Sequence, residues 1–512
     1  MDRSRGDSGA SIKSVINKVA RFRWLIFILG NIANLVIFIV LNSFSLTIVG
    51  MIGKHEEQII SLAPVNSSFN ASSSSVVSPR SVHVDWSNVD KSRMLSASFW
   101  GSLVMSLFGG RICELFGPRK VVSLSLLVNG IVTLLFPVIS IHSFIGAYVI
   151  RIVSGSCTGI VQPSCIVIVS RWSMVSERTL ANAVVSSGNA FSNLISLPLA
   201  GILVDSSFLG GWPSVFYLFG GLNLIVAIIW FIVVYDTPEV HPYLGSEELE
   251  VILKNRSVSS GGSVKVPWCK MFTSIPIIAY LIPAFTYGWV VAVVTSQVPS
   301  FYEDILDFSY TGGEARVYSL SYHRARVNGF VTSLPWLVGI GAQLIGSAVT
   351  DRIRKANRFS LASIRKIVTV LCNCSIGLVA ITMLGKHRIP VVLTLALAKG
   401  MGTLSVAGSG VNHLDIAPSF AGTLAGFYGV MLSLASLIAN EAAAHIVGKN
   451  SSQQNWYHYF YISSAVNIAG VILFCLLGSG EIQSWDPASS TNRRNVKSKT
   501  RSNDLELLSV EH

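Results

Sequence analysis

The stretch from Asn412 to Pro418, NHLDIAP, places an amide, an imidazole and a carboxylate together between two apolar runs. Such groups occur in metal and catalytic sites, and also where one helix ends and the next begins. Asp415 can accept hydrogen bonds from the first amides of a following helix, and Pro418 suits its first turn. No activated serine or cysteine accompanies Asn412, His413 and Asp415. The pattern favours a polar hinge, with a gate or a direct substrate contact as the functional alternative.

Ionisable residues inside other apolar runs are also candidates for function, because charges are costly in hydrocarbon. Arg151 lies about seven residues into its run, roughly 10 Å deep, and no acidic residue stands one turn away to form a structural ion pair. Arg151 is therefore a candidate for a functional contact, with a structural ion pair as the alternative. Lys399 also lies inside an apolar run and is either a functional contact or the partner of Glu441. His445 shares a helix face with Glu441, so the two form a candidate proton-responsive site for ion coupling, unless His445 simply reaches external water.

The composition identifies the class of protein that holds these charges. Of the 512 residues, 51% are hydrophobic and only 12% are charged, about half the charged fraction of a soluble protein. The net charge of +12 could suggest nucleic-acid binding, but the basic residues cluster between long apolar segments. The seven cysteines have no paired spacing in a candidate external loop. The sequence predicts an all-α membrane protein without nucleic acid, metal or cofactor, and excludes a soluble enzyme.

The number of apolar segments predicts the architecture, because about 20 apolar residues span a bilayer. We expect twelve spans, and only helices or closed barrels satisfy the backbone in lipid. The predicted spans are Trp24–Val49, Leu95–Cys113, Val121–Ile141, Phe144–Ser170, Leu180–Val204, Ser214–Val234, Met271–Val298, Val327–Val349, Ile367–Leu384, Pro390–Val411, Ala421–Val447 and Tyr459–Leu477.

The distribution of basic residues predicts the orientation and the division of the chain. Lysines and arginines gather in alternate loops and in the C-terminal tail, which places both termini in the cytoplasm. Asn66, Asn70 and Asn450 begin glycosylation motifs on the opposite side. We divide the chain into a cytoplasmic tail, a six-helix bundle, a cytoplasmic linker, a second six-helix bundle and a C-terminal tail, over residues 1–23, 24–235, 236–270, 271–478 and 479–512.

Several motifs resemble one family. The loop Gly110–Lys120 resembles the G-x-x-x-D/E-x-x-G-x-R-R/K loop of the major facilitator superfamily, and residues 347–355 echo it after the eighth span. Other stretches resemble the branch of sialin, vesicular glutamate and type I phosphate transporters, and the resemblance covers about residues 20–487. These stretches are Arg171–Arg178, Trp212–Tyr217, Val266–Trp268, Asn412–Pro418 and Gly480–Trp485.

This resemblance implies a major facilitator fold with a pseudo-twofold repeat, and secondary active transport of a small organic or inorganic anion by alternating access. It implies coupling to H⁺ or Na⁺, and places a substrate-binding arginine at Arg151. Lys399 would assist, and Tyr287 and Trp289 would shape the pocket. Glu177 and Arg178 lie in the loop that is the first-half counterpart of Asn412–Pro418, so they join Asn412, His413 and Asp415 as hinge or gate candidates.

Some positions depart from the family pattern. These carriers often have an arginine in the first span, where this chain has Leu41. Many carry a second arginine in the seventh span, where this chain offers only Tyr287. An acidic residue usually follows the fourth-span arginine by two turns, and Thr158 stands there. The predicted binding pocket therefore holds fewer positive charges than the family pattern. A transport-silent sensor or scaffold and an uncoupled anion channel of the same fold remain alternatives. One arginine suits phosphate, sialate, glutamate or urate alike, in the plasma membrane or in a lysosomal or vesicular membrane.

Overall fold

The computed structural model describes residues 22–51, 84, 86, 88–204, 206, 208–255, 266–298, 301, 305, 317–356, 358–371, 375–385, 387–447, 452–487 and 489. Over these residues all regular elements are helical. This follows from the apolar composition, because a helix satisfies its own backbone hydrogen bonds where lipid offers none. The three predicted glycosylation sites, Asn66, Asn70 and Asn450, lie outside the described residues.

The first half of the chain forms long helices that we call the N-terminal bundle. Its helices are α2 (Phe22–Met51), α4 (Asn88–Phe116), α5 (Pro118–His142), α6 (Phe144–Trp172), α7 (Arg178–Val204) and α8 (Pro213–Val233). The linker then forms two shorter helices, α9 (Ser246–Asn255) and α10 (Trp268–Phe272).

The second half forms the C-terminal bundle. Its longer helices are α11 (Ile275–Ala292), α13 (Val317–Lys355), α16 (Arg388–Leu404), α18 (Ala421–Ile446) and α19 (Gln453–Leu477). Three shorter helices complete it: α14 (Leu361–Leu371), α15 (Ser375–Leu384) and α17 (Asn412–Ile416). A turn of 3₁₀ helix, Pro418–Phe420, leads directly into α18, so the expected role of Pro418 in a first turn is confirmed.

Ten helices in the described ranges are long and apolar enough to cross a membrane. The two other predicted spans are the second and the ninth. The helix of the second span, α4, is 29 residues long but carries several charges near its two ends, which lowers its apolar character. The ninth span corresponds to α14 and α15, which are separated by residues 372–374 outside the described ranges.

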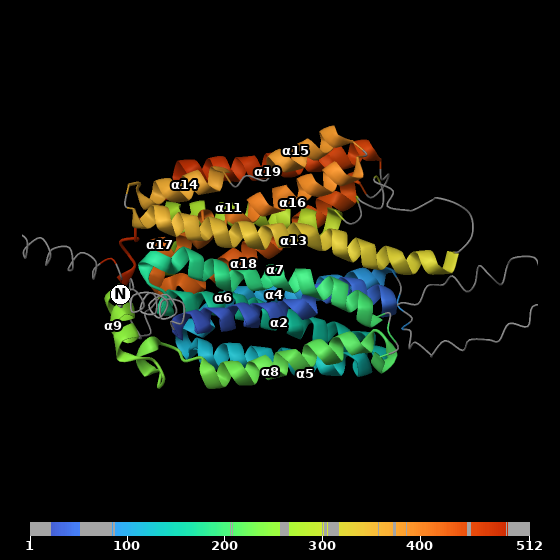
Figure 1. Cartoon of the computed structure of the whole chain (residues 1–512), viewed down its shortest axis with the longest axis horizontal. Coiled ribbons are helices and arrows are strands. Elements are labelled where there is room, and N and C mark those ends of the chain that lie inside the picture. The colour runs from blue at the N-terminus through green and yellow to red at the C-terminus, as the bar shows by residue number, and fades with distance from the viewer. Residues whose placement is uncertain are drawn as a thin grey trace, which may run out of the picture.

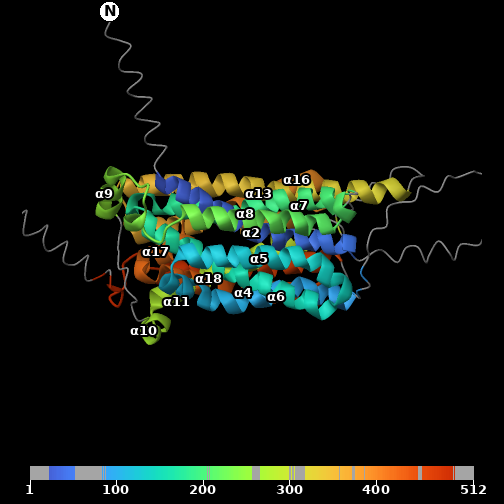
Figure 2. The same ribbon diagram turned by 90° about the horizontal axis from the view of Figure 1, so that it is seen from below.

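The helices run side by side along the long axis of the molecule (Figures 1 and 2). Within the N-terminal bundle, α4 packs on α6, α2 on α7 and α5 on α8; within the C-terminal bundle, α11 packs on α18 and α19. The bundles meet where α7 packs on α13 and α4 on α18. One end of the molecule carries α9 and α17, and we call it the basic end (Figure 1). The last turns of α4, α6 and α13, which carry Arg111, Arg171, Arg352 and Arg354, lie at this end.

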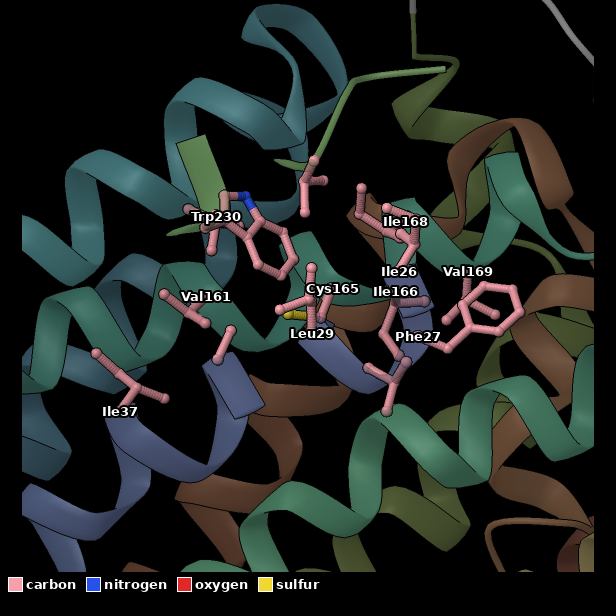
Figure 3. Close-up of a cluster of buried hydrophobic side chains, with 14 of the residues drawn as sticks. Ile26, Phe27, Leu29, Ile37, Val161, Cys165, Ile166, Ile168, Val169 and Trp230 are labelled. Atoms are coloured by element: carbon pink, nitrogen blue, oxygen red, sulfur yellow. The ribbon is translucent and has the colours of Figure 1, made fainter. Parts of the chain in front are cut away.

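Each bundle contains a large cluster of buried apolar side chains. In the N-terminal bundle, side chains of α2, α6 and α8 interlock around Trp230 (Figure 3). In the C-terminal bundle, a separate cluster joins α11, α15, α16, α18 and α19 around Trp289 and Trp456. The first cluster also includes Val411, Leu414, Ala421 and Ala425 of the C-terminal bundle, so apolar packing continues across the interface between the bundles.

Glycine allows two close helix contacts that a side chain would prevent. On α6, a Cβ added to Gly155 would lie 1.9 Å from the Ser98 carbonyl oxygen of α4. Between the bundles, a Cβ added to Gly110 would lie 1.8 Å from the Gly422 carbonyl oxygen. Small residues permit such approaches in lipid-embedded helices. The second contact fixes how tightly the bundles close at the basic end.

Candidate functional site

Arg151 is buried in α6 with an aromatic partner. Its side chain is 2% exposed, and its guanidinium carbon lies 3.7 Å from the ring centroid of Phe44 on α2. The Ser98 hydroxyl donates to the Arg151 carbonyl at 3.2 Å, which fixes the helix rather than the charge. Over the described residues, Arg151 pairs with no carboxylate, and its Nε has no hydrogen-bond acceptor. The positive charge is therefore stabilised without being neutralised.

Lys399 is the second buried cation and lies in α16. Its ammonium nitrogen is 4.1 Å from the ring centroid of Trp336 on α13 and 5.6 Å from that of Tyr287 on α11. The predicted neighbour Tyr287 is thus at the site, and Trp336 is a residue that the sequence analysis missed. A tryptophan in an apolar span gives no signal of its own, because such residues usually belong to the core.

Trp289 lies elsewhere than the predicted pocket. Its indole N–H donates to the Ser463 hydroxyl of α19 at 3.0 Å, inside the core of the C-terminal bundle. Side chains two positions apart on a helix point about 200° apart. Because Tyr287 faces Lys399, Trp289 on the same helix points away from Lys399.

The residues at the departures from the family pattern add no charge near Arg151. The Thr158 hydroxyl donates to the Ser154 carbonyl of its own helix at 3.1 Å. Leu41 is half-buried and packs on the core of the N-terminal bundle. Its neighbour one turn further along α2 is Phe44, whose ring lies against Arg151.

Glu441 and His445 form an exposed pair near the end of α18 opposite the basic end. The carboxylate lies 3.5 Å from the imidazole, and the two side chains are 74% and 76% exposed. Glu441 is therefore exposed rather than buried inside its span. The alternative pairing of Glu441 with Lys399 is not formed either, because Lys399 is buried beside Trp336.

At the basic end, buried polar contacts cross between the bundles. The Arg178 guanidinium donates to the Leu414 carbonyl at 2.7 Å. Arg365 pairs with Asp415 at 2.8 Å and also donates to the Thr179 hydroxyl at 3.3 Å. We call these five residues the crossing cluster. It holds the start of α7 against α14 and α17, and so closes the basic end.

Asp415 does not cap the following helix, contrary to the expectation from its position before Pro418. Its carboxylate pairs with Arg365 and, at 3.4 Å, with Arg354. The amide and hydroxyl of Ser419 donate instead to Asp486, at 3.2 and 2.6 Å. The helix-cap expectation fails because the two arginines approach from α13 and α14, which local sequence does not reveal.

The other predicted hinge residues form contacts within their own bundles. Glu177 pairs with Arg23 at 2.6 Å. The Asn412 amide donates to the Ser479 carbonyl at 3.0 Å, and His413 Nδ1 lies 3.1 Å from the Gly410 carbonyl. Of the five predicted residues, the crossing cluster contains Arg178 and Asp415. Within the described residues, no group of three His, Cys, Asp or Glu side chains could hold a metal ion.

Two acidic residues from the echoing loops make equivalent contacts across the interface. Glu114, near the end of α4, accepts hydrogen bonds from the Thr423 amide and hydroxyl, both at 2.8 Å. Asp351, near the end of α13, accepts one from the Leu180 amide at 2.8 Å. Thr423 and Leu180 are the third residues of α18 and α7, so each carboxylate meets the positive end of a helix in the opposite bundle.

Two paired bundles, buried cations between helices and mutual helix-end contacts define a transporter-like membrane fold. The model of the Major Facilitator Superfamily matches residues 35–440. This chain belongs to that superfamily, whose members are transporters rather than enzymes. The predicted fold class, an all-α membrane protein with two six-helix bundles, is confirmed.

Individual relatives agree with the branch predicted from the motifs. The chain is 28% identical to vesicular glutamate transporter 1 of Xenopus tropicalis over 404 residues, which is 77% of this chain but only 66% of that protein. It is 26% identical to human sialin, over 78% of this chain and 77% of sialin. It is also 26% identical to mouse sodium-dependent phosphate transport protein 3, over 80% of this chain and 82% of that protein. The family resemblance is therefore confirmed.

A solved structure agrees on the fold. The proton:xylose symporter XylE bound to 6-bromo-6-deoxy-D-glucose superimposes with a TM-score of 0.65, covering 90% of this chain and 97% of that one. At 11% sequence identity this likeness concerns the fold alone.

Proposed function

We propose that the protein is a secondary active transporter of small organic or inorganic anions, in which Arg151 is the main substrate contact. The observation that carries this proposal is a guanidinium that is 2% exposed and has no carboxylate partner over the described residues. A buried charge of this kind is costly unless function requires it. Relatives named for the transport of glutamate, sialate or phosphate support the anion class.

Lys399 is the second anion contact in this proposal. It lies in α16, which contains the fourth span of the C-terminal bundle, as Arg151 lies in the fourth span of the N-terminal bundle. The rings of Tyr287 and Trp336 lie next to the Lys399 ammonium group. Coupling to H⁺ or Na⁺, with Glu441 and His445 as the ion-coupling pair, is proposed from the family and from their adjacency.

Alternating access would use the crossing cluster as one gate. In the structure its contacts, together with those of Glu114 and Asp351, hold the bundles together at the basic end. The excess of lysine and arginine there supports a cytoplasmic position of this end and of both termini. Rocking of the bundles would then break these contacts to release the anion into the cytoplasm.

The test is uptake into proteoliposomes of labelled glutamate, sialate, phosphate and urate, with imposed pH, Na⁺ and voltage gradients. We expect one anion to accumulate, and Arg151→Ala to lower its uptake at least about tenfold, since charged hydrogen bonds contribute about 1.5–3 kcal/mol. Arg93→Ala is the control, because the Arg93 side chain is 64% exposed. The driving gradient would identify the coupling ion. Equal uptake by wild type and Arg151→Ala would contradict the proposed site.

A transport-silent sensor or scaffold is the second candidate function, and Leu41 and Thr158 favour it. Neither supplies a charge next to Arg151. Absence of uptake of every anion by folded wild-type protein, under every gradient, would support this alternative. Anion currents uncoupled from any ion gradient would instead indicate a channel.

A further inference from the structure

Each bundle holds its buried cation against aromatic rings. In the N-terminal bundle, Arg151 of the fourth helix lies over Phe44 of the first. In the C-terminal bundle, Lys399 of the fourth helix approaches Tyr287 of the first, with Trp336 of the second closer still. In both bundles a cation of the fourth span thus lies near a ring of the first helix, although the residue types and the distances differ.

We propose that Phe44 is a positioning residue for Arg151, and that the face of its ring takes the place of a carboxylate in holding the guanidinium ready for an anion. This inference rests on the proposed function. A carboxylate partner would neutralise the guanidinium and compete with the substrate, whereas a ring face stabilises the cation and leaves its charge in place.

The geometry matches this role. The separation of 3.7 Å is well inside the range of about 6 Å for a cation–π contact, and burial removes the water that would weaken it. The Nε atom has no acceptor over the described residues, so it can serve an incoming anion. Phe44 holds the guanidinium by its face, and the N–H groups at the edge stay available.

A purely structural role for Phe44 has to be separated from this one. Its ring also packs on Phe136 and Phe216, with centroids 5.7 and 6.2 Å away. Replacement by leucine would therefore disturb packing and charge together. Fluorinated phenylalanines keep the shape of the ring while they progressively weaken its negative face, so they isolate the cation–π contribution.

The experiment introduces mono-, di- and trifluorophenylalanine at position 44 of the full-length protein. We expect KM for the transported anion to rise with each fluorine, to about tenfold for the trifluoro form, with little change in the maximal rate. The melting temperature of the anion-free protein should fall in parallel, and these steps should vanish in the Arg151→Met background. The same series at Phe216, whose ring packs against Phe44, Phe136 and Trp212, is the matched control.

The possible results separate the two proposals. Melting temperatures that do not depend on fluorination, or that change equally with Arg151→Met, would overturn the cation–π contact. A melting series that behaves as expected with an unchanged KM would overturn the positioning role. Uptake of no anion by wild type would refute the proposed transport. The positioning role would then be tested by the rise in melting temperature that glutamate, sialate, phosphate or urate causes. Fluorination at position 44 should reduce this rise, and an unchanged rise would overturn the positioning role.

Discussion

Replacing Asp415 by asparagine probes the gate at the basic end. The Asp415 carboxylate lies 2.8 Å from Nη2 and 3.0 Å from Nε of Arg365, and both side chains are at most 1% exposed. Arg354 adds a longer contact of 3.4 Å. The substitution keeps the side-chain shape but leaves the Arg365 guanidinium buried without an anionic partner.

The expected magnitude follows from that burial. Removing one partner of a buried ion pair costs about 3–5 kcal/mol. Arg365 also donates to Thr179 of the other bundle, so the cost falls on the state in which the basic end is closed. Separation of the bundles lets water reach the guanidinium and relieves the cost. Even about 3 kcal/mol would shift the ratio of closed to open protein by about 100-fold.

The assay measures the distance between spin labels on the two bundles at this end. Lys120 and Arg358 are exposed and lie on opposite bundles, so cysteines there can carry labels once the native cysteines are replaced. We expect Asp415→Asn to populate a longer distance. Glu481→Gln is the control, because it removes an exposed carboxylate at the same end.

A double variant sharpens the result. Asp415→Asn combined with Arg365→Met removes both charges of the pair and should restore much of the closed population, since the buried uncompensated cation is gone. If Asp415→Asn lowers the melting temperature but leaves the distance distribution unchanged, the pair stabilises the fold and does not control the gate.

Three further predictions concern the interface between the bundles and the pair formed by Glu441 and His445. Glu114→Ala removes both hydrogen bonds to Thr423 and should also lengthen the label distance, by a population shift of about tenfold; an unchanged distribution would show that this helix-end contact is dispensable. Gly110→Ala places a methyl group against the Gly422 carbonyl, so we expect initial uptake rates to fall at least about fivefold, and wild-type rates would contradict the close approach. A coupling role for Glu441 predicts that Glu441→Gln abolishes gradient-driven accumulation but keeps exchange of labelled for unlabelled anion; full accumulation would remove Glu441 from coupling.

Local patterns were sufficient for much of the architecture. Apolar run length predicted most of the spans, because a helix that crosses lipid must be long and must satisfy its own backbone. The motif at Gly110–Lys120 identified the superfamily. Arg151 stood out because a charge inside an apolar run is rare. Its burial could be predicted from the run alone, without knowledge of its neighbours in space.

The partners of those residues were decided by the tertiary structure. Which ring faces Arg151, which arginines reach Asp415 and which way Trp289 points all depend on how helices distant in sequence are rotated and paired. Hydrophobic periodicity constrains which face of a helix is buried but not which residue of another helix meets it. The exposure of Glu441 has the same origin, because its distance from the core is set by the position of α18 in the bundle and not by the sequence around it.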